Sequence, residues 1–129
     1  MTEEFVTLET AKLLKEKGFK EDVFTFYEVD CVEGDMILSE TYDESENFNE
    51  KNDCLSAPTQ SLAQKWLRET KNIHICVYNC ACGYGYEISK ADNGTHMASS
   101  VYKGTNDGEE WDSYEEALEA GLQEALKLI

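Results

Sequence analysis

The segment Ser113-Tyr-Glu-Glu-Ala-Leu-Glu-Ala-Gly-Leu-Gln-Glu-Ala-Leu-Lys-Leu-Ile129 carries the strongest structural signal in this chain of 129 residues. Ser113 and Glu116 have the spacing of a capping box, in which the two side chains satisfy backbone N–H groups at the start of a helix. Apolar residues then recur at intervals of three or four along one helix face: Tyr114, Leu118, Leu122, Ala125 and Ile129. We therefore predict a helix at 113–128.

Gly121 lies in the middle of this predicted helix, between Ala117 and Ala125. A glycine inside a helix costs about 1 kcal/mol relative to alanine. Close packing of the helix on a sheet or on another helix would compensate for that cost. The stripe of small residues therefore predicts such a close approach.

The residues before this helix indicate a sheet. Residues 73–78 alternate between apolar and polar side chains, as in a half-buried strand. A second strand at 84–90 is predicted to return beside it after a turn that ends at Gly83, and a third strand is predicted at 97–103.

Another helix is predicted at 59–70, because Pro58 disfavours helical geometry in the residue before it. Gln60 and Gln64 lie off the apolar stripe of this helix and are expected to face water. The second part of the chain is therefore predicted to have the order α-β-β-β-α.

The first part of the chain is predicted to hold a helix at 8–17 and a β-hairpin formed by residues 23–31 and 36–42. An acidic loop of about 43–55 follows.

We expect one α+β domain at 1–129, with a mainly antiparallel sheet of four to five strands. Helices 59–70 and 113–128 are expected on one face of this sheet, with helix 8–17 at an end or edge. The alternative is two sub-units with a boundary near residue 57.

The chain is strongly acidic, with 27 Asp and Glu against 11 Lys and Arg and a formal net charge of −16. Such a surface repels phosphate backbones and anionic lipid headgroups, which argues against direct nucleic-acid or membrane binding. The acids concentrate at 40–53 and 104–116. In the simpler interpretation these charges only solvate the surface, as runs of charge usually do. In the more specific hypothesis they form a docking surface for a basic protein partner. The acids of this surface are Glu40, Asp43, Glu44, Glu46, Glu50, Asp53, Asp107, Glu109 and Glu110.

The chain has five cysteines, an odd number, and its first residues resemble no secretory signal. We therefore expect reduced thiols and a cytoplasmic protein. Soft metal ligands cluster within nine residues: His74, Cys76, Cys80 and Cys82. Their spacing is not a standard zinc pattern, so no cofactor is expected and zinc is the alternative. In the other interpretation Cys76 packs as a small apolar residue and Cys80 and Cys82 lie at a hairpin tip.

No catalytic residue can be assigned from the sequence. His74 and His96 are the only imidazole bases, and neither belongs to a local motif for nucleophilic catalysis. A non-enzymatic protein is therefore expected.

Three segments of the chain resemble a set of short, uncharacterised proteins of gut bacteria that are similar to phage- or mobile-element-associated proteins. These segments are Thr7-Leu-Glu-Thr-Ala-Lys-Leu-Leu-Lys-Glu-Lys-Gly-Phe19, Ser56-Ala-Pro-Thr-Gln-Ser-Leu-Ala-Gln-Lys-Trp-Leu-Arg-Glu69 and the C-terminal segment 113–129. The resemblance implies a bacterial, intracellular accessory protein. It brings no known activity and no site residue.

The leading hypothesis for function is an accessory or interaction protein of a phage or mobile element that binds a partner through its acidic surface. One alternative is a DNA-mimicking inhibitor whose carboxylates occupy phosphate-like positions on a nucleic-acid-binding protein. The other alternative is a small metal or thiol protein that uses the cysteines of residues 76–82.

Overall fold

The C-terminal helix predicted from the capping box is present as α3, Tyr114–Lys127. The computed structural model describes residues 4–29, 34–81, 83–100 and 111–129. The Ser113 hydroxyl accepts a hydrogen bond from the Glu116 backbone N–H at 3.2 Å and caps the helix. The local signal at 113–116 therefore determines where this helix begins.

The chain divides into two compact units, Met1–Thr59 and Gln60–Ile129. Among the described residues, each unit contains one antiparallel sheet of three strands, and the α+β class predicted from the sequence is confirmed. The single sheet of four to five strands was wrong in detail, because the strands form two separate sheets. The division after residue 59 lies two residues beyond the boundary that the sequence suggested near 57.

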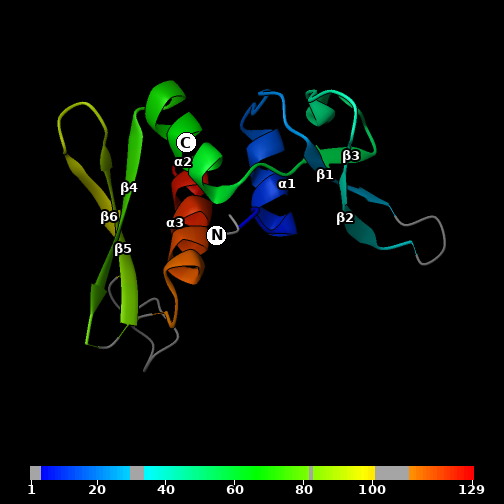
Figure 1. Cartoon of the computed structure of the whole chain (residues 1–129). Helices are drawn as coiled ribbons and strands as arrows, with labels where there is room; N and C mark the ends of the chain where they lie inside the picture. The colour runs from blue at the N-terminus through cyan, green and yellow to red at the C-terminus, as the bar shows by residue number, and fades with distance from the viewer. Residues whose placement is uncertain (1–3, 30–33, 82, 101–110) are drawn as a thin grey trace. The chain divides into compact units, whose positions relative to one another are not determined.

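The first unit holds one helix and a sheet (Figure 1). Helix α1, Leu8–Glu16, begins at the capping residue Thr7 and ends before Gly18, whose φ of 91° suits glycine. The predicted hairpin is confirmed as β1, Thr25–Val29, paired with β2, Met36–Glu40. Residues 30 and 31 of the expected first strand lie outside the described residues.

The acidic stretch that was predicted as a loop at 43–55 contains regular structure. A 3-10 turn, η1, spans Phe48–Glu50, and strand β3 spans Cys54–Ser56. β3 pairs antiparallel with β1 on the side away from β2, so that the sheet has the order β2-β1-β3. The loop prediction was wrong here because a three-residue strand is too short to show an alternating pattern.

The second unit has its helices on one side of its sheet, as Figure 1 shows. Helix α2, Gln60–Thr70, precedes the strands β4, Ile73–Cys80, β5, Gly83–Lys90, and β6, His96–Ser99. Adjacent strands are antiparallel and the sheet order is β4-β5-β6. The expected order α-β-β-β-α is therefore confirmed, and residues 101–103 of the predicted third strand lie outside the described part of the chain.

The expectation that Gln60 and Gln64 face water was wrong. The Gln60 side-chain amide is buried and donates to the Glu115 backbone carbonyl and to the Glu119 carboxylate, each at 2.9 Å. The Gln64 amide donates to the Ile75 carbonyl at 2.8 Å. Gln60 therefore connects α2 to α3, and Gln64 connects α2 to β4. A side-chain amide can make such contacts because it donates to backbone carbonyls that lie outside the regular hydrogen-bond pattern of a helix or sheet.

Helix α3 packs closely on the sheet at Gly121, as the small-residue stripe predicted. A Cβ atom added to this glycine would lie 3.0 Å from Ile75 Cγ2 and 3.2 Å from Tyr86 Cγ. The Tyr86 hydroxyl donates to the Glu124 carboxylate on the next turn of the helix at 2.6 Å. Burial, and then this bond to Glu124, raise the pKa of the Tyr86 phenol well above its ordinary value. The phenol therefore stays protonated and continues to donate to the helix.

Candidate functional site

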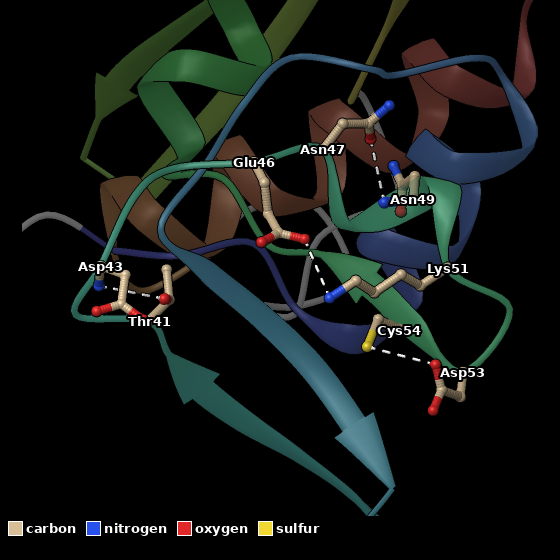
Figure 2. A network of polar contacts seen from close by, with 8 residues as sticks. All are labelled: Thr41, Asp43, Glu46, Asn47, Asn49, Lys51, Asp53 and Cys54. Carbon is tan, nitrogen blue, oxygen red and sulfur yellow. Dashed lines mark hydrogen bonds and ion pairs between the residues drawn. The ribbon is translucent and has the colours of Figure 1, made fainter.

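The acidic segment, defined here as residues 40–53, belongs to the first unit and is shown with its polar contacts in Figure 2. It contains six of the nine acids that the sequence assigned to a docking surface: Glu40, Asp43, Glu44, Glu46, Glu50 and Asp53. The other three, Asp107, Glu109 and Glu110, lie outside the described residues. The structure therefore provides the geometry of one of the two predicted acidic stretches.

Phe48 anchors the acidic segment to the core of the first unit. Its side chain is only 3% exposed, and its ring stacks on Phe26 of β1 with 4.2 Å between the centroids. Glu46 forms a backbone bridge with Val23, with N···O distances of 3.0 and 3.1 Å. Burial of a phenylalanine contributes about 2 to 3 kcal/mol. The segment is therefore held at its middle by packing and by backbone hydrogen bonds.

Asn49 connects this segment to two distant parts of the first unit. Its side-chain Nδ2 donates to the Phe19 carbonyl at 2.8 Å, and its Oδ1 accepts from the Ser56 N–H at 2.8 Å. Phe19 and Ser56 are both buried. The Asn49 amide therefore satisfies the buried Phe19 carbonyl, which follows α1, and the buried Ser56 N–H in β3. Without Asn49, these two backbone groups would need water as their hydrogen-bond partner.

Lys15 of α1 holds the end of the same segment. Its Nζ donates to the Lys51 carbonyl at 2.8 Å and to the Cys54 carbonyl at 3.1 Å. An ammonium group that donates to two carbonyls makes charge-assisted hydrogen bonds, which are stronger than neutral ones. Helix α1 thus positions the chain between η1 and β3.

One carboxylate of the acidic segment is neutralised within the segment. The Lys51 Nζ lies 3.0 Å from Glu46 Oε1, and both side chains are about half exposed (Figure 2). The hydrogen bond and charge of Glu46 raise the pKa of Lys51, so the ammonium stays charged. Since this pair is exposed, its effect on stability is small. The Lys51 ammonium does, however, neutralise one of the negative charges of the acidic segment.

Four other carboxylates of the segment have no cationic partner among the described residues. Glu40, Asp43, Glu44 and Glu50 are exposed, and none of them forms an ion pair with another described residue. The Asp43 backbone N–H donates to the Thr41 hydroxyl at 3.4 Å, which shapes the turn without using the carboxylate. The segment therefore presents unneutralised acids on an anchored backbone.

Cys54 and Asp53 form the last contact of this network. The Cys54 thiol donates to Asp53 Oδ1 at 3.7 Å (Figure 2). Burial, and then the charge of Asp53, raise the pKa of the Cys54 thiol above its ordinary value. A thiol in this state is a poor nucleophile, because the thiolate is the reactive form.

We expect Cys54 in the folded protein to react with iodoacetamide at least tenfold more slowly than Cys76 at pH 7.5, because Cys54 is buried and protonated whereas Cys76 is exposed. Mass spectrometry of the alkylated peptides measures both rates in one sample. In concentrated urea the two rates should converge, since unfolding removes the burial. Equal rates in the folded protein would contradict the assigned environment of Cys54.

The proposed zinc ligands are only partly described. His74 and Cys76 lie on β4, opposite Ser89 and Glu87 of β5. Cys80 ends β4 and Cys82 lies outside the described residues. Among the described residues, no three His, Cys, Asp or Glu side chains are grouped so that they could hold a metal ion. The zinc site therefore remains a prediction from the sequence.

The comparisons with known proteins identify no relative. Neither the family models, nor the curated proteins, nor the solved structures searched contain a match to this chain. In the part of the chain that the structure describes, no helix combines the length and apolar character that a membrane span requires. The fold and the acidic segment therefore carry the argument about function by themselves.

The most important residues of this site that the sequence analysis missed are Phe48, Asn49 and Lys15. A sequence signal existed for Phe48, because it is the only aromatic residue of 43–55 and lies among acids. An isolated aromatic residue in a charged stretch often marks a point where a loop is anchored in the core. Asn49 and Lys15 gave no signal, since their partners are backbone groups distant in sequence.

Proposed function

We infer that this protein is a non-enzymatic accessory protein that binds a basic protein partner through the acidic segment. The observation that supports this function is the combination of exposed, unpaired carboxylates with a backbone anchored by Phe48 and Asn49. An anchored segment loses less conformational entropy on binding than a free loop does, so its charges are better placed for recognition. From the sequence resemblance alone we further propose that it is a phage or mobile-element protein that acts in a bacterial cytoplasm.

Charge complementarity favours a basic partner. Residues 21–50 contain eleven acidic residues and no lysine or arginine. Such a region attracts cationic surfaces over several ångströms and increases the rate of encounter, and salt weakens this attraction. Histone-like, ribosomal or other nucleic-acid-binding proteins of the host carry the complementary charge.

Neutralising three carboxylates of the acidic segment should weaken the capture of basic proteins. In the test variant Asp43→Asn, Glu44→Gln and Glu50→Gln are combined, which changes the formal net charge from −16 to −13. A pull-down from bacterial lysate at low salt, with quantitative mass spectrometry, compares this variant with the unaltered protein. We expect at least a fivefold loss of the retained basic proteins, since each exposed charge contributes up to about 1 kcal/mol.

The matched control neutralises three exposed acids of the second unit, through Glu69→Gln, Glu87→Gln and Asp92→Asn. Its net charge is the same, so any difference between the two variants reports the location of the charges. The control should retain the partner, and 0.5 M salt should release it from both proteins. Equal loss in both variants would show that only net charge matters and would contradict a localised docking surface.

A further inference from the structure

Strand β2 forms an edge of the sheet in the first unit. The sheet order β2-β1-β3 leaves β2 paired on one side only. The Thr41 N–H donates to the Phe24 carbonyl at 2.8 Å, so Thr41 and Phe24 form a hydrogen-bonded pair across the hairpin. The register then continues through Phe26 opposite Ser39 and Glu28 opposite Ile37.

The alternation of an antiparallel ladder determines which groups of β2 point away from β1. Hydrogen-bonded and non-hydrogen-bonded pairs alternate, so Ile37 and Ser39 direct their backbone groups toward β1. Met36, Leu38 and Glu40 direct theirs outward, and the structure records no hydrogen-bond partner for these outward groups among the described residues. β2 therefore presents a row of free donors and acceptors.

The opposite edge of the same sheet is protected. On β3, the Ser56 N–H is bonded by Asn49 and the Cys54 carbonyl is bonded by Lys15. Natural proteins commonly block an edge strand in this way to prevent pairing with other chains. The contrast between a blocked β3 and a free β2 marks β2 as the edge that can accept another strand.

The side chains of β2 are also suited to contact another strand. Ile37 is 41% exposed and Leu38 is 46% exposed, although both are large and apolar. Because successive side chains of a strand point to opposite faces, these two residues expose apolar surface on both faces of the sheet at its edge. A strand added beside β2 would cover both.

The negative charge at the end of β2 favours a basic partner. Glu40 ends β2, Asp43 and Glu44 lie just after it, and the nearest bases in the sequence are Lys20 and Lys51. A second copy of this chain would bring the same acids together, which disfavours pairing of β2 with itself. An extended segment that alternates basic and apolar residues would match both the acids and the exposed Ile37 and Leu38.

We propose that β2 is a docking strand, to which a basic, extended segment of the partner protein adds as a fourth strand of the first sheet. This inference rests on the proposed function and specifies how the partner binds. Main-chain hydrogen bonds to Met36, Leu38 and Glu40 supply affinity, while the apolar side chains and the acids supply specificity.

The test uses a fluorescent peptide that alternates lysine and valine, and the same peptide with every backbone nitrogen methylated. The two probes have equal charge, but the methylated one has no N–H group to join a sheet. Fluorescence anisotropy at low salt should show at least tenfold tighter binding of the unmethylated peptide. Equal binding of both would overturn strand addition and leave the proposed electrostatic function intact, whereas no binding of either would contradict both.

Two protein variants locate the binding strand. Leu38→Pro removes the outward N–H of Leu38 and is compatible with an edge strand, so it should abolish the preference for the unmethylated peptide. Leu38→Thr keeps this N–H and should retain the preference. Circular dichroism should show the same fold for both variants.

Amide exchange measured by NMR on the unaltered protein gives a readout that does not depend on a variant. Before the peptide is added, the Ile37 and Ser39 amides should exchange slowly, and the Leu38 and Glu40 amides should exchange rapidly. Binding should slow the exchange of Leu38 and Glu40 at least tenfold. Binding without this change, or protection of Leu38 in the free protein, would overturn the proposal.

Discussion

Replacing Asn49 by alanine is expected to lower the free energy of unfolding of the first unit by about 3 kcal/mol. The substitution leaves two groups without their partner, the buried carbonyl of Phe19 and the buried N–H of Ser56. Each unsatisfied buried group costs about 1 to 3 kcal/mol. Because these groups lie after α1 and in β3, their loss loosens the whole attachment of the acidic segment.

The measurement must report the first unit alone. The only two tryptophans, Trp66 and Trp111, belong to the second unit. Their fluorescence therefore reports the unfolding of the second unit and not of the first. Pulsed alkylation of the buried Cys54 in increasing urea follows the first unit instead. The midpoint for Asn49→Ala should move to lower urea, while the tryptophan transition should move less.

Asn52→Ala is the matched control for this experiment. Asn52 is exposed, lies three residues further along the same segment, and should change stability by less than about 0.5 kcal/mol. A second variant, Asn49→Asp, keeps an acceptor for Ser56 but loses the donor to Phe19, and places a charge beside that carbonyl. If Asn49→Ala matched Asn52→Ala, the bridging role of this amide would be wrong.

Replacing Gly121 by valine should destabilise the second unit by about 2 kcal/mol. The added Cβ meets Ile75 Cγ2 at 3.0 Å and Tyr86 Cγ at 3.2 Å, and the two γ-methyl groups need still more room. Valine gains only a few tenths of a kcal/mol over glycine in helix propensity, so the steric cost dominates. Tryptophan fluorescence during urea unfolding measures the loss, since both tryptophans belong to this unit.

Ala120→Val is the control for the packing at Gly121. Ala120 is the preceding residue of α3 and is half-buried, so the same side chain at that position meets less resistance. A loss below about 1 kcal/mol is expected there, within the range for substitutions outside the core. Equal losses at 120 and 121 would indicate a general intolerance of valine in the helix, and the close approach to Ile75 and Tyr86 would then not be the cause.

Much of the fold could be read from the sequence because its signals are local. The capping residues Thr7 and Ser113 lie within three residues of the N–H groups that they satisfy. The alternation of Ile73 and Ile75 with polar residues likewise reflects the pleat of a single strand. Such signals predicted all three helices of the described chain and most of its strands.

The candidate site was only half predictable. The acids of 40–53 were visible as a run of charge, and the structure shows all six of them exposed. Their anchoring by Phe48 and Asn49 was not visible, and the pairing of Glu46 with Lys51 could have involved several other acids nearby. The charge of the segment follows directly from its amino-acid composition. The contacts of Asn49 do not, because they depend on which backbone groups the fold leaves without a partner in a helix or sheet.

The sequence by itself determined the helices, the hairpin and the negative charge of this protein, because capping, periodicity and composition act over a few residues. Only the tertiary structure decided that Cys54–Ser56 becomes a strand, since β3 exists through its pairing with β1 and through Asn49 and Lys15. It also decided that β3 is the protected edge and β2 the free one. The reason is physical: an edge is defined by the neighbours that a strand lacks, and these are set by contacts between residues far apart in the chain.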